Sequence, residues 1–374
     1  MPSRPPHTGI VDPRAAHALE LMSDFAERTG LVGRKAARRY LWTDAFAVSN
    51  FLGLGRGELA LELVRRVHQV LGRHRADDPR SGWLSADAGP THPTRGGLRI
   101  GKHLPERAAG EPLDERLEWD RDGQYFHYLT KWMHALDQVA HAAGHPMFNQ
   151  WARELAAAAH RAFVRRGRMV WKMSIDLTRP LVSSMGQHDP LDGYVTCAEL
   201  DASAAELAGL PPALEGARAD FAALIAPAAL ATADPLGIGG LLFDALRLDR
   251  LGGEQERETA LLAAALIGLR AWLPRGELRA PAHRRLAFRE LGLAIGLAAV
   301  PRLRRASDAL GDQLRDLAPL ARTIEDFWLR PEQRAATSWQ EHGDINDVML
   351  ATCLVPDGFL ERALPQREAV RVLC

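Results

Sequence analysis

The chain has 374 residues, of which 47% are hydrophobic, and its 47 acidic side chains balance its 47 lysines and arginines. Balanced charge provides no long-range field that would attract nucleic acid or an anionic membrane surface, so we expect neither as a partner. The first residues lack the apolar stretch of an export signal and no run of eighteen apolar residues could span a membrane, so the sequence predicts a cytoplasmic protein.

The apolar spacing predicts a succession of helices with almost no strand pattern. Some helices, such as 147–166, are apolar on one face only, which is typical of an outer layer. Others, such as 125–140 and 286–299, are apolar most of the way round, which is typical of an inner layer. In chain order the expected helices span 13–28, 38–53, 57–74, 121–142, 147–166, 190–208, 213–232, 235–249, 254–273, 284–299, 304–329 and 343–355, and a short tail helix follows Asp357.

The connections alternate in the same way as the helices. Links from an inner helix to the next outer helix are short and rich in Gly or Pro, whereas the links back include two long loops, about 75–119 and 167–189. Irregular loops of that length inside a compact domain are usually functional. We therefore expect the long loops to gather on one face, at the N-terminal ends of the inner helices.

Both long loops contain candidate ligand-binding residues. The stretch 82–107 is too apolar for a disordered linker, so we expect it to fold over this face. The stretch 168–184 has the best strand alternation in the chain and predicts a small hairpin at the rim. The polar residues in question are His92, Arg99, Lys102 and His103 in the first stretch, and Lys172, Asp176 and Arg179 in the second.

Six helical hairpins, whose inner helices form a ring beneath long loops, resemble the (α/α)6 barrel of the six-hairpin glycosidase-like enzymes. This superfamily includes many glycoside hydrolases and the N-acylglucosamine and cellobiose 2-epimerases. The resemblance covers nearly the whole chain and is one of architecture, so it implies one all-α barrel domain over residues 1–374 and transfers no catalytic residue. It also implies that the inner helices present one end each to a shared cavity.

The helix expected at 121–142 carries two lines of residues. An apolar line packs in the core, and a second line repeats at the same steps of three and four: Asp120, Gln124, His127, Lys131 and His134. Asp is a favoured helix N-cap, so a single Asp at a helix start has a structural explanation. Capping does not explain Lys131 and His134, which lie well inside the helix, although His134 could also be a satisfied core histidine. We expect the second line to face the cavity.

Similar polar clusters precede other inner helices and suggest a carbohydrate site. Trp with Asp, Gln, Asn and His suits a neutral sugar, because flat rings cover its C–H faces and polar groups pair with its hydroxyls. The expected substrate-binding residues are Trp42, Asp44, Lys102, Trp119, Gln124, Tyr125, Lys131, Lys172, Arg179, Gln187, Asp192, Trp339 and Asn346.

Two chemistries fit these clusters. Glycoside hydrolysis needs a pair of carboxyl groups, for which the candidates are Asp120, Asp122, Asp189 and Asp344. Epimerisation or isomerisation of a sugar needs groups that titrate near neutrality, for which the candidates are His127, His188 and His342. We expect a glycoside hydrolase first and a sugar 2-epimerase or isomerase as the alternative.

Other classes fit the sequence less well. A terpenoid cyclase needs more aromatic residues than the 6% present, and a non-catalytic binding scaffold should show regular repeats. Cys197, Cys353 and Cys374 are odd in number and lack CxxC spacing, which indicates reduced thiols. We expect no cofactor and predict no metal site, and the sequence determines neither whether a cation is bound nor the oligomeric state.

Overall fold

The structure is a computed structural model that describes residues 12–304 and 309–366. Cys374 and the start of the chain examined for an export signal lie outside these ranges. The helices are α1 (Pro13–Arg28), α2 (Leu41–Gly53), α3 (Gly57–Leu71), α4 (Glu115–Glu118), α5 (Phe126–Ala143), α6 (Pro146–Phe163), α7 (Asp189–Ala208), α8 (Glu215–Leu224), α9 (Pro235–Leu251), α10 (Gln255–Trp272), α11 (Ala287–Ala299), α12 (Ala309–Leu317), α13 (Leu320–Leu329), α14 (Pro331–Arg334), α15 (Thr337–Gln340), α16 (Gly343–Leu354) and α17 (Asp357–Leu360).

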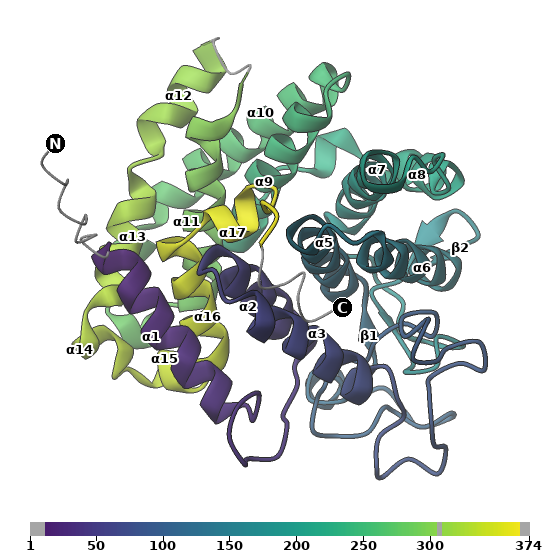
Figure 1. Ribbon diagram of the computed structural model, residues 1–374. Coiled ribbons are helices and arrows are strands. Elements are labelled where there is room, and N and C mark those ends of the chain that lie inside the picture. The colour runs from purple at the N-terminus through teal and green to yellow at the C-terminus, as the bar shows by residue number, and fades with distance from the viewer. Residues whose placement is uncertain (1–11, 305–308, 367–374) are drawn as a thin grey trace, which may run out of the picture.

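Six of these helices form a closed ring. Each packs on the next in the order α2, α5, α7, α9, α11, α16, and α16 returns to α2 (Figure 1). Outer helices α3, α6, α8, α10 and α13 pack on α2, α5, α7, α9 and α11, while the N-terminal helix α1 packs on α16. This arrangement is the all-α (α/α)6 barrel that the sequence predicts.

Buried glycines allow two neighbouring inner helices, α9 and α11, to approach closely. A Cβ atom added to Gly239 would lie 2.1 Å from the carbonyl oxygen of Gly292, and one added to Gly296 would lie 2.5 Å from the Cα atom of Gly239. Both separations are far shorter than a van der Waals contact, so only glycine fits at these positions. The contact sets the spacing of this part of the ring.

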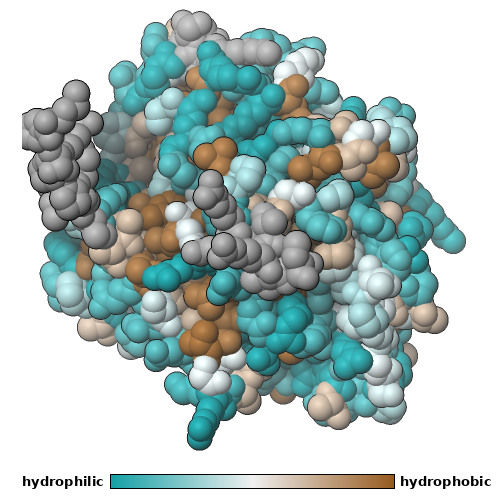
Figure 2. All heavy atoms as spheres, in the orientation of Figure 1, coloured by the Kyte–Doolittle hydropathy of each residue, from teal (hydrophilic) through white to brown (hydrophobic). Residues whose placement is uncertain are grey.

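The outer layer is mostly polar toward solvent. Figure 2 shows hydrophilic side chains over most of one face, with hydrophobic side chains limited to small patches. Amphipathic outer helices explain this surface: α6 buries Phe148 and Leu155 and leaves Gln150 exposed. Among the described residues, no helix is long and apolar enough to cross a membrane.

Short strands lie at the rim of the barrel, where the sequence predicts a hairpin. The antiparallel hairpin is formed by β4 (Lys172–Met173) and β5 (Pro180–Val182), and β1 (Gln124–Tyr125) joins it as a third strand along β4. The strands β2 (Val164–Arg165) and β3 (Arg168–Met169) form a separate pair.

Three predicted helices differ from the observed ones: one begins later, and two are interrupted by a proline. The helix predicted from 121 begins at Phe126, because the two preceding residues pair with β4 instead. The helices predicted at 213–232 and 304–329 are interrupted near Pro227 and Pro319. Proline lacks an N–H group and its ring clashes with the preceding turn, so both segments break there.

Candidate functional site

The second polar line of α5 faces the middle of the ring. His127, Lys131 and His134 follow one another at steps of four and three residues along this helix. The ring of His134 contacts the rings of Phe243 on α9 and Phe359 on α17, at centroid distances of 5.2 and 5.0 Å. Because these residues come from different sides of the barrel, the polar face of α5 lines its interior.

Aromatic side chains close one end of this interior. Phe359 on α17 stacks on Phe46 of α2 at 4.6 Å and packs against Phe243 at 4.5 Å. Figure 1 shows α17 lying across the middle of the ring. It follows α16, so this plug lies toward the C-terminal ends of the inner helices, and a ligand would have to approach from their N-terminal ends.

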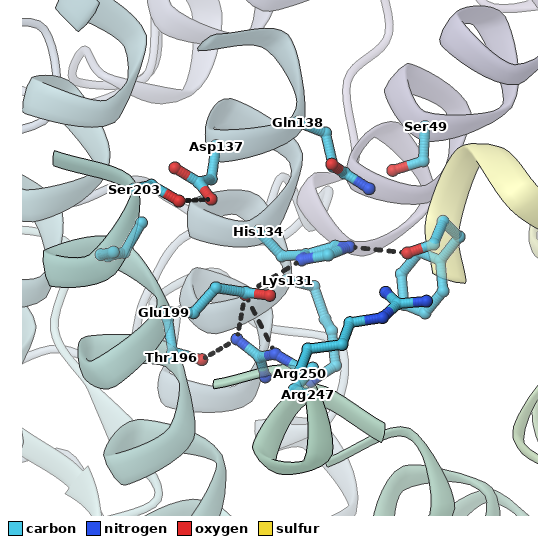
Figure 3. A network of polar contacts seen from close by, with 12 residues as sticks. Ser49, Lys131, His134, Asp137, Gln138, Thr196, Glu199, Ser203, Arg247 and Arg250 are labelled. Carbon is cyan, nitrogen blue, oxygen red and sulfur yellow. Dashed lines mark hydrogen bonds and ion pairs between the residues drawn. The ribbon is translucent and has the colours of Figure 1, made fainter. Parts of the chain in front are cut away.

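A buried network of charges connects α5, α7 and α9 (Figure 3). Arg247 on α9 donates to Glu199 at 2.8 Å and to Asp244 at 3.1 Å. Lys131 donates to Asp192 at 2.7 Å, and Arg247 lies 3.5 Å from the same carboxylate. The cationic partners hold these charges in place and keep the network rigid.

The network gives its carboxylates different pKa values. Against the effect of burial, the charges of Lys131 and Arg247 lower the pKa of Asp192, and Arg247 and His134 lower that of Glu199. Burial, together with the nearby charge of Asp192, raises the pKa of Asp244 to about 6. Asp192 and Glu199 are therefore fixed anions at neutral pH.

His127 and Asp189, near the N-terminal ends of the inner helices, each have one buried polar atom without a hydrogen-bond partner among the described residues. The Nδ1 atom of His127 lies 4.0 Å from Oδ1 of Asp189, the first residue of α7. The two unpartnered atoms are the Nδ1 atom of His127 and the Oδ2 atom of Asp189, both buried, and neither bonds to any residue in 12–304 or 309–366. The side chain of His127 nonetheless remains 28% exposed, so part of the imidazole can be reached from outside.

Burial changes the charge of both groups. It lowers the pKa of His127 to about 4, an effect to which the positive charge of Lys131 adds. It raises the pKa of Asp189 to about 7, and the negative charge of Asp192 adds to that. At neutral pH the imidazole is therefore neutral while the carboxyl group retains a proton in much of the population. Two such groups with separated pKa values form a suitable acid–base pair.

Aromatic rings surround His127 at the same place. Its imidazole stacks on Tyr125 at 5.4 Å and lies nearly parallel to Trp171 at 5.9 Å. Trp42 from α2 packs edge-on against it at 6.0 Å, and Tyr128 lies at 4.8 Å. These rings hold the imidazole in one orientation, and they explain how burial lowers its pKa.

Asp189→Asn is expected to stabilise the protein at pH 8. The pKa of Asp189 is near 7 in the folded state and about 3.9 in an unfolded chain. Folding therefore becomes less favourable as the pH rises from about 4 to 7, since the unfolded chain ionises first, and the full cost remains above pH 7. This difference in pKa corresponds to at most about 4 kcal/mol in the free energy of unfolding. Thermal unfolding of the variant and the unchanged protein at pH 4 and pH 8 measures this free energy.

Asp192→Asn is the matched contrast on the same helix. The pKa of Asp192 is lowered in the folded state, so this substitution should destabilise the protein at pH 8 and leave Lys131 without its partner. If both variants shift the melting temperature in the same direction, the assignment of charge to the two carboxyl groups is wrong.

A cleft of about 1140 Å³ lies at the N-terminal ends of α2 and α16, and neither His127 nor Asp189 is among its lining residues. Tyr40 lines it, and the hydroxyl of Tyr40 is hydrogen bonded at 2.7 Å to that of Tyr128, which packs on His127. The cleft thus adjoins the aromatic cage of the histidine. It brings together seven residues singled out from the sequence: Asp44, Lys102, His103, Asp120, Trp339, His342 and Asp344.

Several of these cleft residues are occupied by structural contacts. Asp344 pairs with Arg28 and Arg38 at 3.2 and 2.8 Å. Asp44 accepts from Arg39 and from the backbone N–H of Tyr40, at 3.2 and 3.1 Å, and is buried. Their carboxylates anchor the ends of α16 and α2, so we keep Lys102, His103, Asp120 and His342 as the candidate ligand contacts of the cleft.

Four other candidates are buried and bound to the backbone. Asp122 accepts from Arg99 at 2.5 Å and from the N–H groups of two glycines. The amide of Gln124 bonds to three backbone groups, Lys172 donates to two carbonyls and to Glu118, and Asn346 donates to one carbonyl. All four are less than 1% exposed, so we assign them to holding the loops and do not propose that they contact a ligand.

The remaining candidates lie around the mouth, and some of their polar atoms form hydrogen bonds within the protein. Gln187, His188 and Arg179 each bond to backbone carbonyls of neighbouring loops. Trp339 is buried against Trp328 at 5.4 Å, whereas Trp119 is 55% exposed. Of these, the exposed Trp119, which packs edge-on against Trp171 at 4.9 Å, stays a candidate for stacking on a sugar.

The loop 82–107 does not present all its polar residues to the mouth. His92 bonds to Glu154 on the outer helix α6 at 2.7 Å, and Arg99 is buried on Asp122. Lys102 and His103 do line the cleft. Of the four alternatives that the loop offered, the early residues therefore cover α6 and the later ones reach the cleft.

Sequence reasoning missed Glu199, Asp244 and Arg247. The helix around the last two reads as nearly apolar, and an Asp followed three residues later by an Arg resembles an ordinary surface pair. Their position within the helix could have identified them, because the charges at 244 and 247 of α9 lie among residues that are buried on every side. Among the described residues, no group of three or more metal-binding side chains occurs.

The fold resembles that of one solved sugar enzyme. The chain superposes on the structure described as "Crystal structure of D-mannose isomerase" with a TM-score of 0.50 and 12% sequence identity, over 95% of this chain and 100% of that chain. No family model matches the chain, and no curated protein matches it by sequence. Identity this low supports the shared helical barrel, and the chemistry has to be argued from the residues.

Proposed function

We propose that this protein is a sugar isomerase, which moves a proton between C2 and C1 of an open-chain aldose through an enediol. The observation that carries the proposal is the His127–Asp189 pair, a neutral base beside a carboxyl group that retains its proton. Support comes from the shared barrel with a D-mannose isomerase. The closed ring also supports treating the chain as one domain.

In this mechanism the neutral imidazole of His127 removes the proton from C2. Asp189 gives a proton to the carbonyl oxygen O1, so that an enediol forms without a free charge on the sugar. His127 then returns its proton to C1 while the O2 hydroxyl gives a proton back to Asp189, and a ketose results. The 4.0 Å between the two groups is too long for a hydrogen bond, so neither neutralises the other in the free protein.

Lys131 has a supporting role in this proposal. Its ammonium group is held by Asp192 one turn beyond His127 and retains 14% exposure. A fixed positive charge near the substrate oxygens would stabilise the negative charge that develops as C2 loses its proton. The same charge keeps the imidazole neutral by lowering its pKa.

The geometry favours an isomerase over the hydrolase expected first from the sequence. Hydrolysis would need a second available carboxylate beside Asp189. Asp192 is held by Thr130, Lys131 and Arg247, and Asp120 lines the cleft, which neither His127 nor Asp189 lines. A single base that serves both carbons suits isomerisation on one face of the enediol, whereas epimerisation needs a second group on the opposite face. His342, which immediately precedes the inner helix α16, is the candidate for that alternative.

Deuterium exchange tests the proposal directly. Incubated with free aldoses in D₂O, the protein should introduce deuterium at C2 and release the corresponding ketose, both detected by NMR. Formation of the C2 epimer without ketose would establish the epimerase instead. Release of reducing sugar from glycosides, with no exchange at C2 of any free aldose, would contradict the proposal.

A further inference from the structure

A second cavity, of about 500 Å³, lies at the N-terminal ends of two neighbouring inner helices, α9 and α11. The short 3-10 turns between α10 and α11 form its other wall. Four arginines and three acidic residues line it: Arg275, Arg284, Arg285, Arg289, Asp234, Glu277 and Glu290. The proposed mechanism uses none of them.

The acidic residues of this cavity are already engaged. Asp234 pairs with Arg289 at 2.7 Å. Glu290 forms a buried, two-pronged pair with Arg285, with a shortest distance of 2.6 Å. Glu277 accepts a hydrogen bond of 2.8 Å from the buried indole of α10. The carboxylates therefore offer little to a cationic ligand.

The arginines of the cavity, in contrast, are not all paired with carboxylates. Arg275 and Arg284 are exposed and form no ion pair within the part of the chain that the structure describes. Arg289 uses one terminal nitrogen for Asp234, while its Nε atom is buried and has no hydrogen-bond partner. Three guanidinium groups around one cavity thus keep unused N–H donors.

Both helices that begin at the cavity add positive potential. Neither α9 nor α11 has a side chain that caps its first turn, although the residue before α9 is an aspartate. Asp234 turns to Arg289 instead of to the helix N–H groups. Free N–H groups at a helix start, together with the helix dipole, attract anions.

We propose that this cavity binds a phosphate group. A phosphate monoester offers three acceptor oxygens, which match the forked donors of arginine, and its charge of nearly two suits several cations at once. The volume exceeds that of a bare phosphate, so a phosphate carried on a small organic molecule would also fit.

The cavity adjoins the proposed active site through the first turn of α9. A Cβ atom added to Gly237 would lie 3.3 Å from the ring of His188, which immediately precedes Asp189 in the chain. The phosphate could therefore be carried by the sugar substrate itself or by a separate molecule that acts on the neighbouring helix. The same binding chemistry serves both sources.

Calorimetric titration of the full chain with inorganic phosphate tests the site without relying on the isomerase activity. We expect saturable binding, weakened on the order of tenfold or more by Arg284→Gln and by Arg289→Gln, because each removes a charged hydrogen-bond donor. Arg279→Gln is the matched control, since Arg279 is exposed on the same loop and does not line the cavity. Absence of binding, or equal weakening by the control, would overturn the proposal.

Asp234→Asn provides a test in the opposite direction. It removes the carboxylate that competes for Arg289, so phosphate should bind more tightly than to the unchanged protein, and weaker binding would contradict the site. Kinetics then distinguish the sources. A lower KM for an aldose phosphate than for the neutral aldose, lost in Arg284→Gln, places the phosphate on the substrate. A change in turnover of the neutral aldose on adding inorganic phosphate indicates a separate molecule.

Discussion

Replacing His127 with Gln should lower kcat for aldose isomerisation on the order of a hundredfold to ten-thousandfold, with a much smaller change in KM. The reason is that glutamine fills similar space within the aromatic cage but cannot take a proton from C2. The rings of Tyr125, Tyr128 and Trp171 that hold the imidazole should hold the amide as well. Steady-state kinetics and the rate of deuterium incorporation at C2 measure the effect.

The control is His160→Gln. His160 lies on the outer helix α6 and pairs with Asp220 on its exposed side, so this change should leave both rates unaltered. Circular dichroism and the melting temperature establish that the His127 variant is folded. A folded variant that retains C2 exchange at the original rate would remove His127 as the base, and a loss confined to KM would make it a binding residue.

The helical barrel was largely predictable because its signals are local and repeated. Apolar residues recur at helical steps, and Gly and Pro mark the short links, so the positions of the inner helices follow from the sequence alone. The failures lie where a tertiary contact overrides the local pattern. Gln124 and Tyr125 continue a helical pattern yet pair with β4, which shortens α5 at its start.

The candidate site was predictable only in part, because polar residues near a helix start serve two purposes. His127 and Asp189 come together at the mouth, as the ring arrangement implies. Asp122 and Lys172 were expected at the same mouth, but they are buried on backbone groups of the long loops. Which partner a polar side chain selects depends on how the loops fold, and no periodicity encodes that.

Arg247→Met should be among the most destabilising single substitutions in the barrel wall, with a loss of about 3–5 kcal/mol in the free energy of unfolding at pH 7. Arg247 is the shared partner of Glu199 and Asp244, and it lies 3.5 Å from Asp192. Methionine fills comparable volume but leaves these buried carboxylates without their main cation. Thermal or denaturant unfolding measures the loss.

The pH dependence of that loss identifies its cause. In the unchanged protein the lowered pKa values of Asp192 and Glu199 contribute stability above about pH 4 that disappears as the pH falls through the folded-state values. In the variant those pKa values rise, so the difference between the two proteins should shrink as the pH falls from 7 to 4. A loss that is constant over this range would indicate lost packing rather than uncompensated charge.

Arg250→Met is the matched control for this substitution. Arg250 lies three residues further along α9, and it pairs with Glu361 at 2.5 Å where both side chains are partly exposed to solvent. Exposed pairs contribute about 0–1 kcal/mol, so its loss should be small and screened by salt. Because α17 lies beside this pair, a large loss of stability in Arg250→Met would show that the position of α17 depends on the Arg250–Glu361 pair. The charge network around Arg247 would then contribute less to the stability of the barrel than its contacts imply.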